Sequence, residues 1–153
     1  MPDAVVVGGI DAIIGSTGDF SQNGIPDAWE VANQLDPTAT ADALRDTDGD
    51  GFADGDEYIL GANPNARTAA LVTPAIVGAN LTLTFTATAA SGTGYTGLTR
   101  NFDVETTTNL GTPASWTPLV GYTNITGANQ TVVVTQPLTG GPRFYRLKVR
   151  VQP

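Results

Sequence analysis

A twelve-residue stretch, residues 46–57, constrains the fold of this chain more than any other feature of the sequence. Aspartate stands at its positions 1, 3 and 5, glycine at position 6 and glutamate at position 12. A loop of this pattern supplies the six to eight oxygen ligands that calcium takes at about 2.3–2.6 Å, and carboxylates this dense repel one another strongly without a cation. We therefore predict a calcium site whose ligands are Asp46, Asp48, Asp50, the carbonyl of Phe52, Asp54 (often through a water) and Glu57.

Another loop of the same length begins 27 residues upstream, at Asp19. Glycine again stands at position 6 and glutamate at position 12, whereas serine and asparagine replace the aspartates at positions 3 and 5. The smaller ligand charge predicts a weaker calcium site. Its predicted ligands are Asp19, Ser21, Asn23, the carbonyl of Ile25, Asp27 and Glu30. The alternative is a degenerate loop whose polar residues only form turns and cap the following helix.

Charge is divided unevenly along the chain. Residues 1–66 hold thirteen of the fifteen acidic residues and one base, Arg45, for a net charge of −12, whereas residues 67–153 carry +4. An acidic segment of this charge repels itself unless bound cations neutralise it. The four bases near the C-terminus alternate with apolar residues, which predicts the solvent-exposed face of a strand. With a total charge of −8 and no basic helix, the chain is not expected to bind nucleic acid.

Each loop leads into a short helical pattern. The first pattern, residues 27–35, places Trp29, Ala32 and Leu35 on one face, and the second, residues 54–60, ends at Gly61. No good helix precedes either loop, so we expect EF-hand-like loops in a small module rather than paired helix–loop–helix units.

The rest of the chain alternates between apolar and polar residues in the manner of short strands. The clearest candidates are residues 81–88, 102–105, 131–135 and 145–151, with weaker ones at 70–77 and 116–120. Short strands at regular spacing, separated by turn residues, predict a β-sandwich of immunoglobulin or fibronectin type. The expected fold class is therefore mostly β, with a small N-terminal calcium-loop module that contains two short helices.

These patterns divide the chain into an N-terminal strand (residues 1–18), a two-loop calcium module (residues 19–66) and a sandwich (residues 67–153). The N-terminal segment contains an uninterrupted apolar run, residues 4–7, which is typical of a strand covered on both faces. The run either joins a sheet of its own chain or pairs with the sheet edge of a neighbouring subunit.

Two parts of the chain resemble known families. The stretches Gly24-Ile-Pro-Asp-Ala-Trp-Glu30, Leu35-Asp-Pro37, Asp46-Thr-Asp-Gly-Asp-Gly51 and Glu57-Tyr-Ile-Leu-Gly61 resemble the thrombospondin type 3-like calcium repeat of bacterial secreted proteins. The resemblance covers roughly residues 19–66 and implies a calcium-rigidified spacer beside β domains. Residues 102–110, Trp116 and residues 144–149 are similar to a C-terminal β-sandwich of large exported bacterial proteins, to which no catalytic role attaches.

Catalysis is not expected from this composition. The chain has no histidine and no cysteine, which removes the usual general base, the Ser-His-Asp triad and thiol nucleophiles. Carboxylate chemistry remains, but Glu30 and Glu57 are assigned to calcium. Asp103 and Glu105 are expected to face opposite sides of a strand, which would prevent them from acting as an acid/base pair.

The sequence thus predicts a calcium-stabilised structural or adhesion protein, located outside the cell or at its surface in a mature form without a signal peptide. Its expected partners are calcium and either further copies of the chain or neighbouring extracellular domains. A more specific form of this hypothesis is a filament subunit that assembles by exchange of the N-terminal strand. No apolar run is long enough to span a membrane. The alternative is a calcium-dependent carbohydrate-binding module with Tyr95 and Tyr122 as candidate platform residues.

Overall fold

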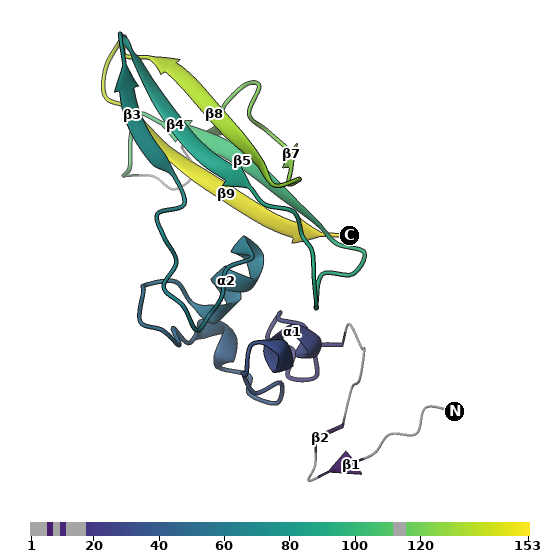
Figure 1. The fold of residues 1–153 in the computed structure, drawn as a ribbon. Coiled ribbons are helices and arrows are strands. Elements are labelled where there is room, and N and C mark those ends of the chain that lie inside the picture. The colour runs from purple at the N-terminus through teal and green to yellow at the C-terminus, as the bar shows by residue number, and fades with distance from the viewer. Residues whose placement is uncertain (1–5, 8–9, 12–17, 112–115) are drawn as a thin grey trace. The chain divides into compact units, whose positions relative to one another are not determined.

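The computed structural model describes residues 6–7, 10–11, 18–111 and 116–153 (Figure 1). The chain divides into two compact units. The first unit comprises Met1–Thr68 together with Ser91–Gly97, and the second comprises Ala69–Ala90 together with Leu98–Pro153. Of the helices in the described residues, none is long and apolar enough to cross a lipid bilayer.

The second unit contains two antiparallel sheets (Figure 1). The first sheet has the strand order β3-β4-β8, and in the second the central strand β5 pairs with β9 and with the short strands β6 and β7. The strands are β3 (Thr73–Val77), β4 (Asn80–Ala87), β5 (Thr99–Thr107), β6 (Thr117–Pro118), β7 (Ile125–Thr126), β8 (Gln130–Pro137) and β9 (Phe144–Gln152). The predicted fold class, mostly β with a small module that contains two short helices, is confirmed.

The core of this unit lies between the inner faces of the two sheets. Phe85 of β4 and Phe102 of β5 contact each other with ring centroids 5.8 Å apart, and Val134 of β8 is fully buried. The alternation of apolar and polar residues in β4 and β9 places the two kinds of side chain on opposite faces, as predicted. Leu83 and Leu147 pack against this core, and the threonines of β4 occupy the other face.

The outer face of β5 carries two carboxylates, and here one prediction was wrong. Asp103 and Glu105 lie two residues apart in a strand and therefore share a face instead of opposing each other. Both are largely buried and ion-paired with β9: Arg150 lies 3.0 Å from Asp103, and Arg146 lies 2.6 Å from Glu105. The predicted row of bases does lie half-exposed on this outer face, and there it also forms cross-strand ion pairs.

In its described residues, the first unit contains three short helices, α1 (Asp27–Ala32), the 3₁₀ helix η1 (Asp42–Leu44) and α2 (Asp54–Leu60). Helix α2 ends as predicted, because Gly61 adopts a left-handed conformation with φ 73°. Helix α1 ends earlier than predicted, and Ala32 is exposed rather than buried beside Trp29. The chain leaves the helix after Ala32 through Gln34, whose φ is 63°.

An aromatic cluster forms the core of the first unit. Trp29 of α1 meets Tyr58 of α2 edge to face at 5.4 Å, and Tyr95 stacks on Tyr58 at 4.9 Å. The Tyr95 hydroxyl donates a 2.5 Å hydrogen bond to the carbonyl of Tyr58. The loop Ser91–Gly97, which connects β4 to β5, therefore packs with the helices that follow the two acidic loops.

The predicted N-terminal strand is described in part. Val6–Val7 (β1) pairs antiparallel with Ile10–Asp11 (β2), and these four residues form a separate two-stranded sheet. Apart from residue 18, the rest of the predicted segment 1–18 lies outside the described residues.

Candidate metal centre

The two acidic loops share one backbone frame. In the loop of residues 46–57, hereafter the second loop, the carboxylate of Asp46 accepts hydrogen bonds from the N–H groups of Asp50 (3.1 Å) and Gly51 (2.9 Å). In the loop of residues 19–30, hereafter the first loop, Asp19 accepts from the residues at the same two positions, at 3.1 and 2.8 Å. A short carboxylate at position 1 thus closes each loop on itself.

The remaining turns of the two loops also correspond. The side chain at position 5 accepts a 2.8 Å hydrogen bond from the N–H at position 7 in both loops, from Ile25 to Asn23 and from Phe52 to Asp50. Residues at positions 4 and 6 have positive φ in both, which glycine adopts without strain. Three of these four residues are glycines, and the fourth is Gln22, at position 4 of the first loop.

The second loop brings three carboxylates together. Asp46, Asp48 and Asp50 each offer an oxygen, and these oxygens lie within 4.8 Å of one another. Glu57, from α2, is fully buried at the end of the same loop. Hard oxygen donors at this density are the ligands that calcium prefers.

Four buried carboxylate oxygens in the described part of the chain accept no hydrogen bond, and all four belong to predicted ligands. They are Oδ2 of Asp48 and Oε2 of Glu57 in the second loop, and Oδ2 of Asp27 and Oε2 of Glu30 in the first. A buried charged oxygen without a partner costs more than the 1–3 kcal/mol typical of an unpaired neutral group. A bound calcium ion would replace the absent partners, so the residues present fit this ion in both loops.

The electrostatics of the two glutamates point the same way. Burial raises the pKa of Glu57 to about 7, a hydrogen bond from Thr68 opposes the rise, and the carboxylates of Asp48, Asp50 and Asp54 add to it. Burial likewise raises the pKa of Glu30 to about 7, opposed by Asn23 and reinforced by acidic neighbours. Both groups are therefore held in sites that disfavour their charged form until a cation is present.

Position 9 differs between the loops. Both oxygens of Asp54 are engaged, one by the N–H of Thr47 at 3.0 Å and the other by the Thr47 hydroxyl at 2.7 Å. In the first loop Asp27 accepts a hydrogen bond only from the N–H of Phe20, at 2.8 Å. Phe20 occupies the position of Thr47 and has no hydroxyl to donate a second bond. Asp54 therefore orders the second loop, whereas Asp27 keeps one oxygen for a ligand.

Thr68 belongs to the second loop in space, although it lies outside the sequence motif. Its N–H donates a 2.5 Å hydrogen bond to Asp50, and its hydroxyl donates a 3.1 Å bond to Oε1 of Glu57. The neighbouring Arg67 donates to the carbonyl of Gly49 at 3.1 Å. The segment that leaves the first unit thus organises the calcium loop, and no local pattern in the sequence indicates it.

Arg45, the single base of residues 1–66, also has a structural role that the sequence does not reveal. Its guanidinium lies 3.1 Å from Asp42 of η1 and 3.6 Å from Asp54. Asp42 is buried, and its negative charge contributes to the raised pKa of Glu30. Arg45 thus offsets part of the negative charge that lies beside both loops.

The first loop uses an amide where the second uses a carboxylate. The side-chain amide of Asn23 donates to Oε1 of Glu30 at 2.8 Å and to the carbonyl of Ala39 at 3.2 Å. Ser21 donates its hydroxyl to Asp19 at 3.3 Å. The first loop is therefore held partly by its own hydrogen bonds, which agrees with a weaker demand for calcium.

The two tyrosines considered as a carbohydrate platform are not exposed rings. Tyr95 is 6% exposed and stacked on Tyr58, and Tyr122 packs against the core of the second unit. The Tyr95 ring is therefore closed to a sugar, and the Tyr122 ring is half-buried.

Comparison with known proteins agrees with the second loop. The model of the bacterial TSP3 repeat matches residues 46–66, from Asp46 through α2 to the residues before Thr68. TSP3 repeats bind calcium, so the match supports the calcium-binding segment expected from the sequence. No curated protein and no solved structure matches the chain, and no family model names the C-terminal sandwich.

Proposed function

We propose that this protein is a non-catalytic structural or adhesion protein of the extracellular space, in which calcium stiffens the first unit. The observation that carries the proposal is the set of four buried carboxylate oxygens without hydrogen-bond partners, two in each loop. TSP3 repeats are typical of extracellular proteins, where calcium is abundant enough to fill sites with dissociation constants of about 10⁻⁴–10⁻³ M.

Calcium acts on the aromatic core through the two helices. Glu30 and Trp29 are adjacent in α1, and Glu57 and Tyr58 are adjacent in α2. An ion that fixes each glutamate therefore also fixes the aromatic ring next to it, and Tyr95 packs on those rings. Loading both loops would stabilise the helices and the Ser91–Gly97 loop together.

The finer proposal is assembly into a filament through the N-terminal strand. Its support is that β1 and β2 have two residues each, and a two-stranded sheet of this size is marginal in water. The charges of −12 and +4 on the two parts of the chain favour head-to-tail contacts, which propagate when the rotation between subunits does not close a ring. Carbohydrate binding is not retained, because its candidate rings are buried or packed against a core.

Thermal unfolding in calcium and in EGTA tests the calcium role. At a calcium concentration of 100 times the dissociation constant, one site adds about 2.7 kcal/mol to the free energy of unfolding. An unfolding curve that does not shift on chelation would remove the proposal. Negative-stain microscopy of the same two samples tests assembly, and monodisperse particles in calcium would refute the filament.

A further inference from the structure

The segment of residues 67–70 carries the chain out of the first unit, which ends at Thr68 in this part of the sequence. These four residues lie outside helices and strands, and three of them are exposed, whereas Thr68 is half-buried. A segment that buries few apolar groups opens at little cost unless specific contacts hold it. The contacts of Thr68 and of its neighbour Arg67 therefore decide whether the segment stays closed.

Three hydrogen bonds connect this segment to the second loop. Arg67 donates to the carbonyl of Gly49 at 3.1 Å. The N–H of Thr68 donates to Oδ2 of Asp50 at 2.5 Å, and its hydroxyl donates to Oε1 of Glu57 at 3.1 Å. Asp50 and Glu57 are the predicted calcium ligands at positions 5 and 12 of the loop. One residue outside the loop thus bridges two ligands that are distant in the sequence.

These bonds orient both carboxylates and leave one oxygen of Glu57 without a partner. Oε1 of Glu57 accepts the Thr68 hydroxyl, whereas Oε2 is buried and accepts no hydrogen bond. The Asp50 carboxylate accepts from Thr68 on one oxygen and from the N–H of Phe52 on the other, so two donors fix its plane. Removal of a donor that orients a metal-ligating side chain typically weakens metal binding about 10–100-fold.

The first loop obtains the corresponding support from within. Its glutamate at position 12, Glu30, accepts a 2.8 Å hydrogen bond from Asn23 at position 5. Position 5 of the second loop is Asp50, and an ionised carboxylate has no proton to donate to Glu57. The donor comes instead from Thr68, which lies beyond the residues matched by the TSP3 repeat. The second loop thus depends on a segment that follows it.

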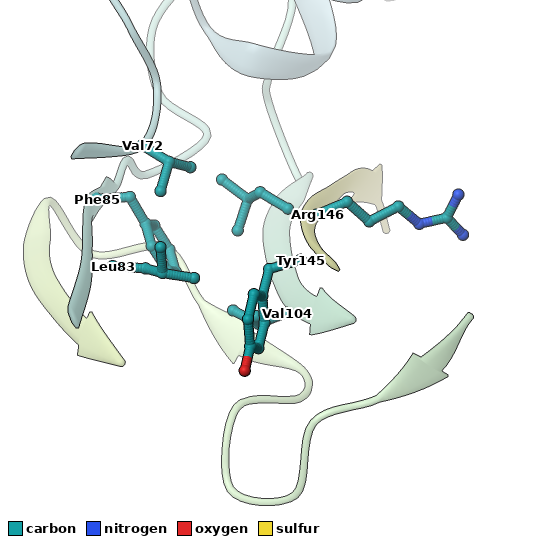
Figure 2. A pocket seen from close by; sticks show the side chains of 7 residues that line it. Val72, Leu83, Phe85, Val104, Tyr145 and Arg146 are labelled. Carbon is teal, nitrogen blue, oxygen red and sulfur yellow. The ribbon is translucent and has the colours of Figure 1, made fainter. Parts of the chain in front are cut away.

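The segment also has an anchor in the second unit. Val72 packs against the core of that unit and lines an apolar hollow there with Leu83 and Phe85 (Figure 2). Only the three residues 69–71 separate Val72 from Thr68. Loss of the Thr68 contacts would therefore free this short connection at its end in the first unit.

We propose that Thr68 is a positioning residue of the second calcium site and that calcium, in return, holds the segment 67–70 closed. The inference rests on the proposed calcium role and names the part of the chain that the second ion controls. Coupling of this kind is reciprocal: if opening of the segment weakens calcium binding by some factor, calcium lowers the open population by the same factor. Calcium at this site therefore protects the peptide bond after Arg67 from cleavage.

Limited digestion with trypsin measures the open population of the segment. Arg67 is exposed and precedes Thr68, so trypsin cuts there once the segment opens. We expect cleavage after Arg67 to slow by about tenfold or more between EGTA and saturating calcium, as measured by mass spectrometry. Arg143, which is exposed in the second unit, is the internal control. Its cleavage rate corrects for any effect of calcium on trypsin itself.

A matched set of substitutions tests the positioning role. Thr68→Val removes the hydroxyl but keeps the side-chain shape and the backbone N–H, whereas Thr68→Ser keeps the hydroxyl. We expect Thr68→Val to weaken the tighter calcium site about tenfold in calorimetric titration and to reduce the protection of the Arg67 bond, and Thr68→Ser to behave like the wild type. Thr38→Val is the control, because the Thr38 hydroxyl donates a 2.7 Å bond to Asp36, which is not a predicted ligand.

The outcomes separate this inference from the proposed function. Calcium affinity of Thr68→Val equal to that of the wild type, even with a lower Tm in both EGTA and calcium, would show a purely structural role and overturn the inference. Cleavage after Arg67 that calcium does not slow overturns it as well, and in both cases the calcium role stands. A wild-type chain that binds no calcium overturns both proposals. The digestion of the wild type needs no substitution, so it decides even if Thr68→Val fails to fold.

Discussion

Replacing Glu57 with glutamine should stabilise the protein without calcium and weaken it with calcium. The Glu57 carboxyl is fully buried, one of its oxygens has no hydrogen-bond partner, and burial raises its pKa from 4.5 to about 7. The folded state therefore binds the proton more tightly than the unfolded state. The cost of ionising Glu57 is absent below pH 4.5, grows as pH rises, and is complete above pH 7.

The size of the effect follows from the shift. One pKa unit corresponds to about 1.36 kcal/mol, so at pH 8 without calcium the ionised Glu57 lowers the free energy of unfolding by roughly 3 kcal/mol at most. Glu57→Gln removes this cost and keeps an oxygen for the Thr68 hydroxyl. For a chain of this length a gain of 1 kcal/mol raises Tm by about 2–4 °C, so we expect a rise in EGTA at pH 8 that does not exceed about 6–12 °C.

In calcium the same substitution removes a charged ligand, so the rise in Tm between EGTA and calcium should shrink sharply. Differential scanning calorimetry at pH 8 and pH 5.5 measures both effects, and the gain in EGTA should be smaller at pH 5.5. Asp56→Asn is the matched control, because Asp56 is an exposed neighbour in the same helix and outside the predicted ligands. If Glu57→Gln lowered Tm in EGTA and left the calcium shift unchanged, the assignment of Glu57 would be refuted.

Three further substitutions have distinct expected outcomes. Asn23→Asp gives the first loop a third aspartate, so calorimetric titration should show tighter calcium binding at the weaker site, and unchanged affinity would argue against that site. Gly94→Ala would place a Cβ atom 2.6 Å from Cβ of Trp29 and should lower Tm more than Gly97→Ala, where the added atom meets nothing within 4 Å. Val134→Ala should cost about 1–3 kcal/mol equally in calcium and in EGTA, because it lies in the core of the second unit; a calcium-dependent loss would contradict this.

The candidate site could be predicted from the sequence to the extent that its residues are local. Asp46 to Glu57 follow one another in a loop whose spacing itself specifies the ion, and glycine at position 6 marks the turn. Thr68 joins the site only because the chain returns past it eleven residues after Glu57, and such a contact leaves no periodic signal. The role of Asn23 was predictable as a loss of charge, but not as a hydrogen bond to Glu30.

The sandwich strands were predictable for the same reason, since alternation is a local pattern. The burial of residues in the loops depends on tertiary contacts, which leave no local pattern in the sequence. Tyr95 lies in a glycine-rich loop that indicates exposure, yet Tyr58 covers its ring. The error over Asp103 and Glu105 was one of counting along a strand rather than of physics, because residues two apart always share a face.

Direct calcium titration of the full chain tests the central claim. We predict two ions per chain, a tighter one lost in Glu57→Gln and a weaker one lost in Glu30→Gln, with no binding in the double variant. Binding that persists undiminished in the double variant, or a wild-type chain that binds no calcium, would contradict the assignment of the unpartnered carboxylates to calcium.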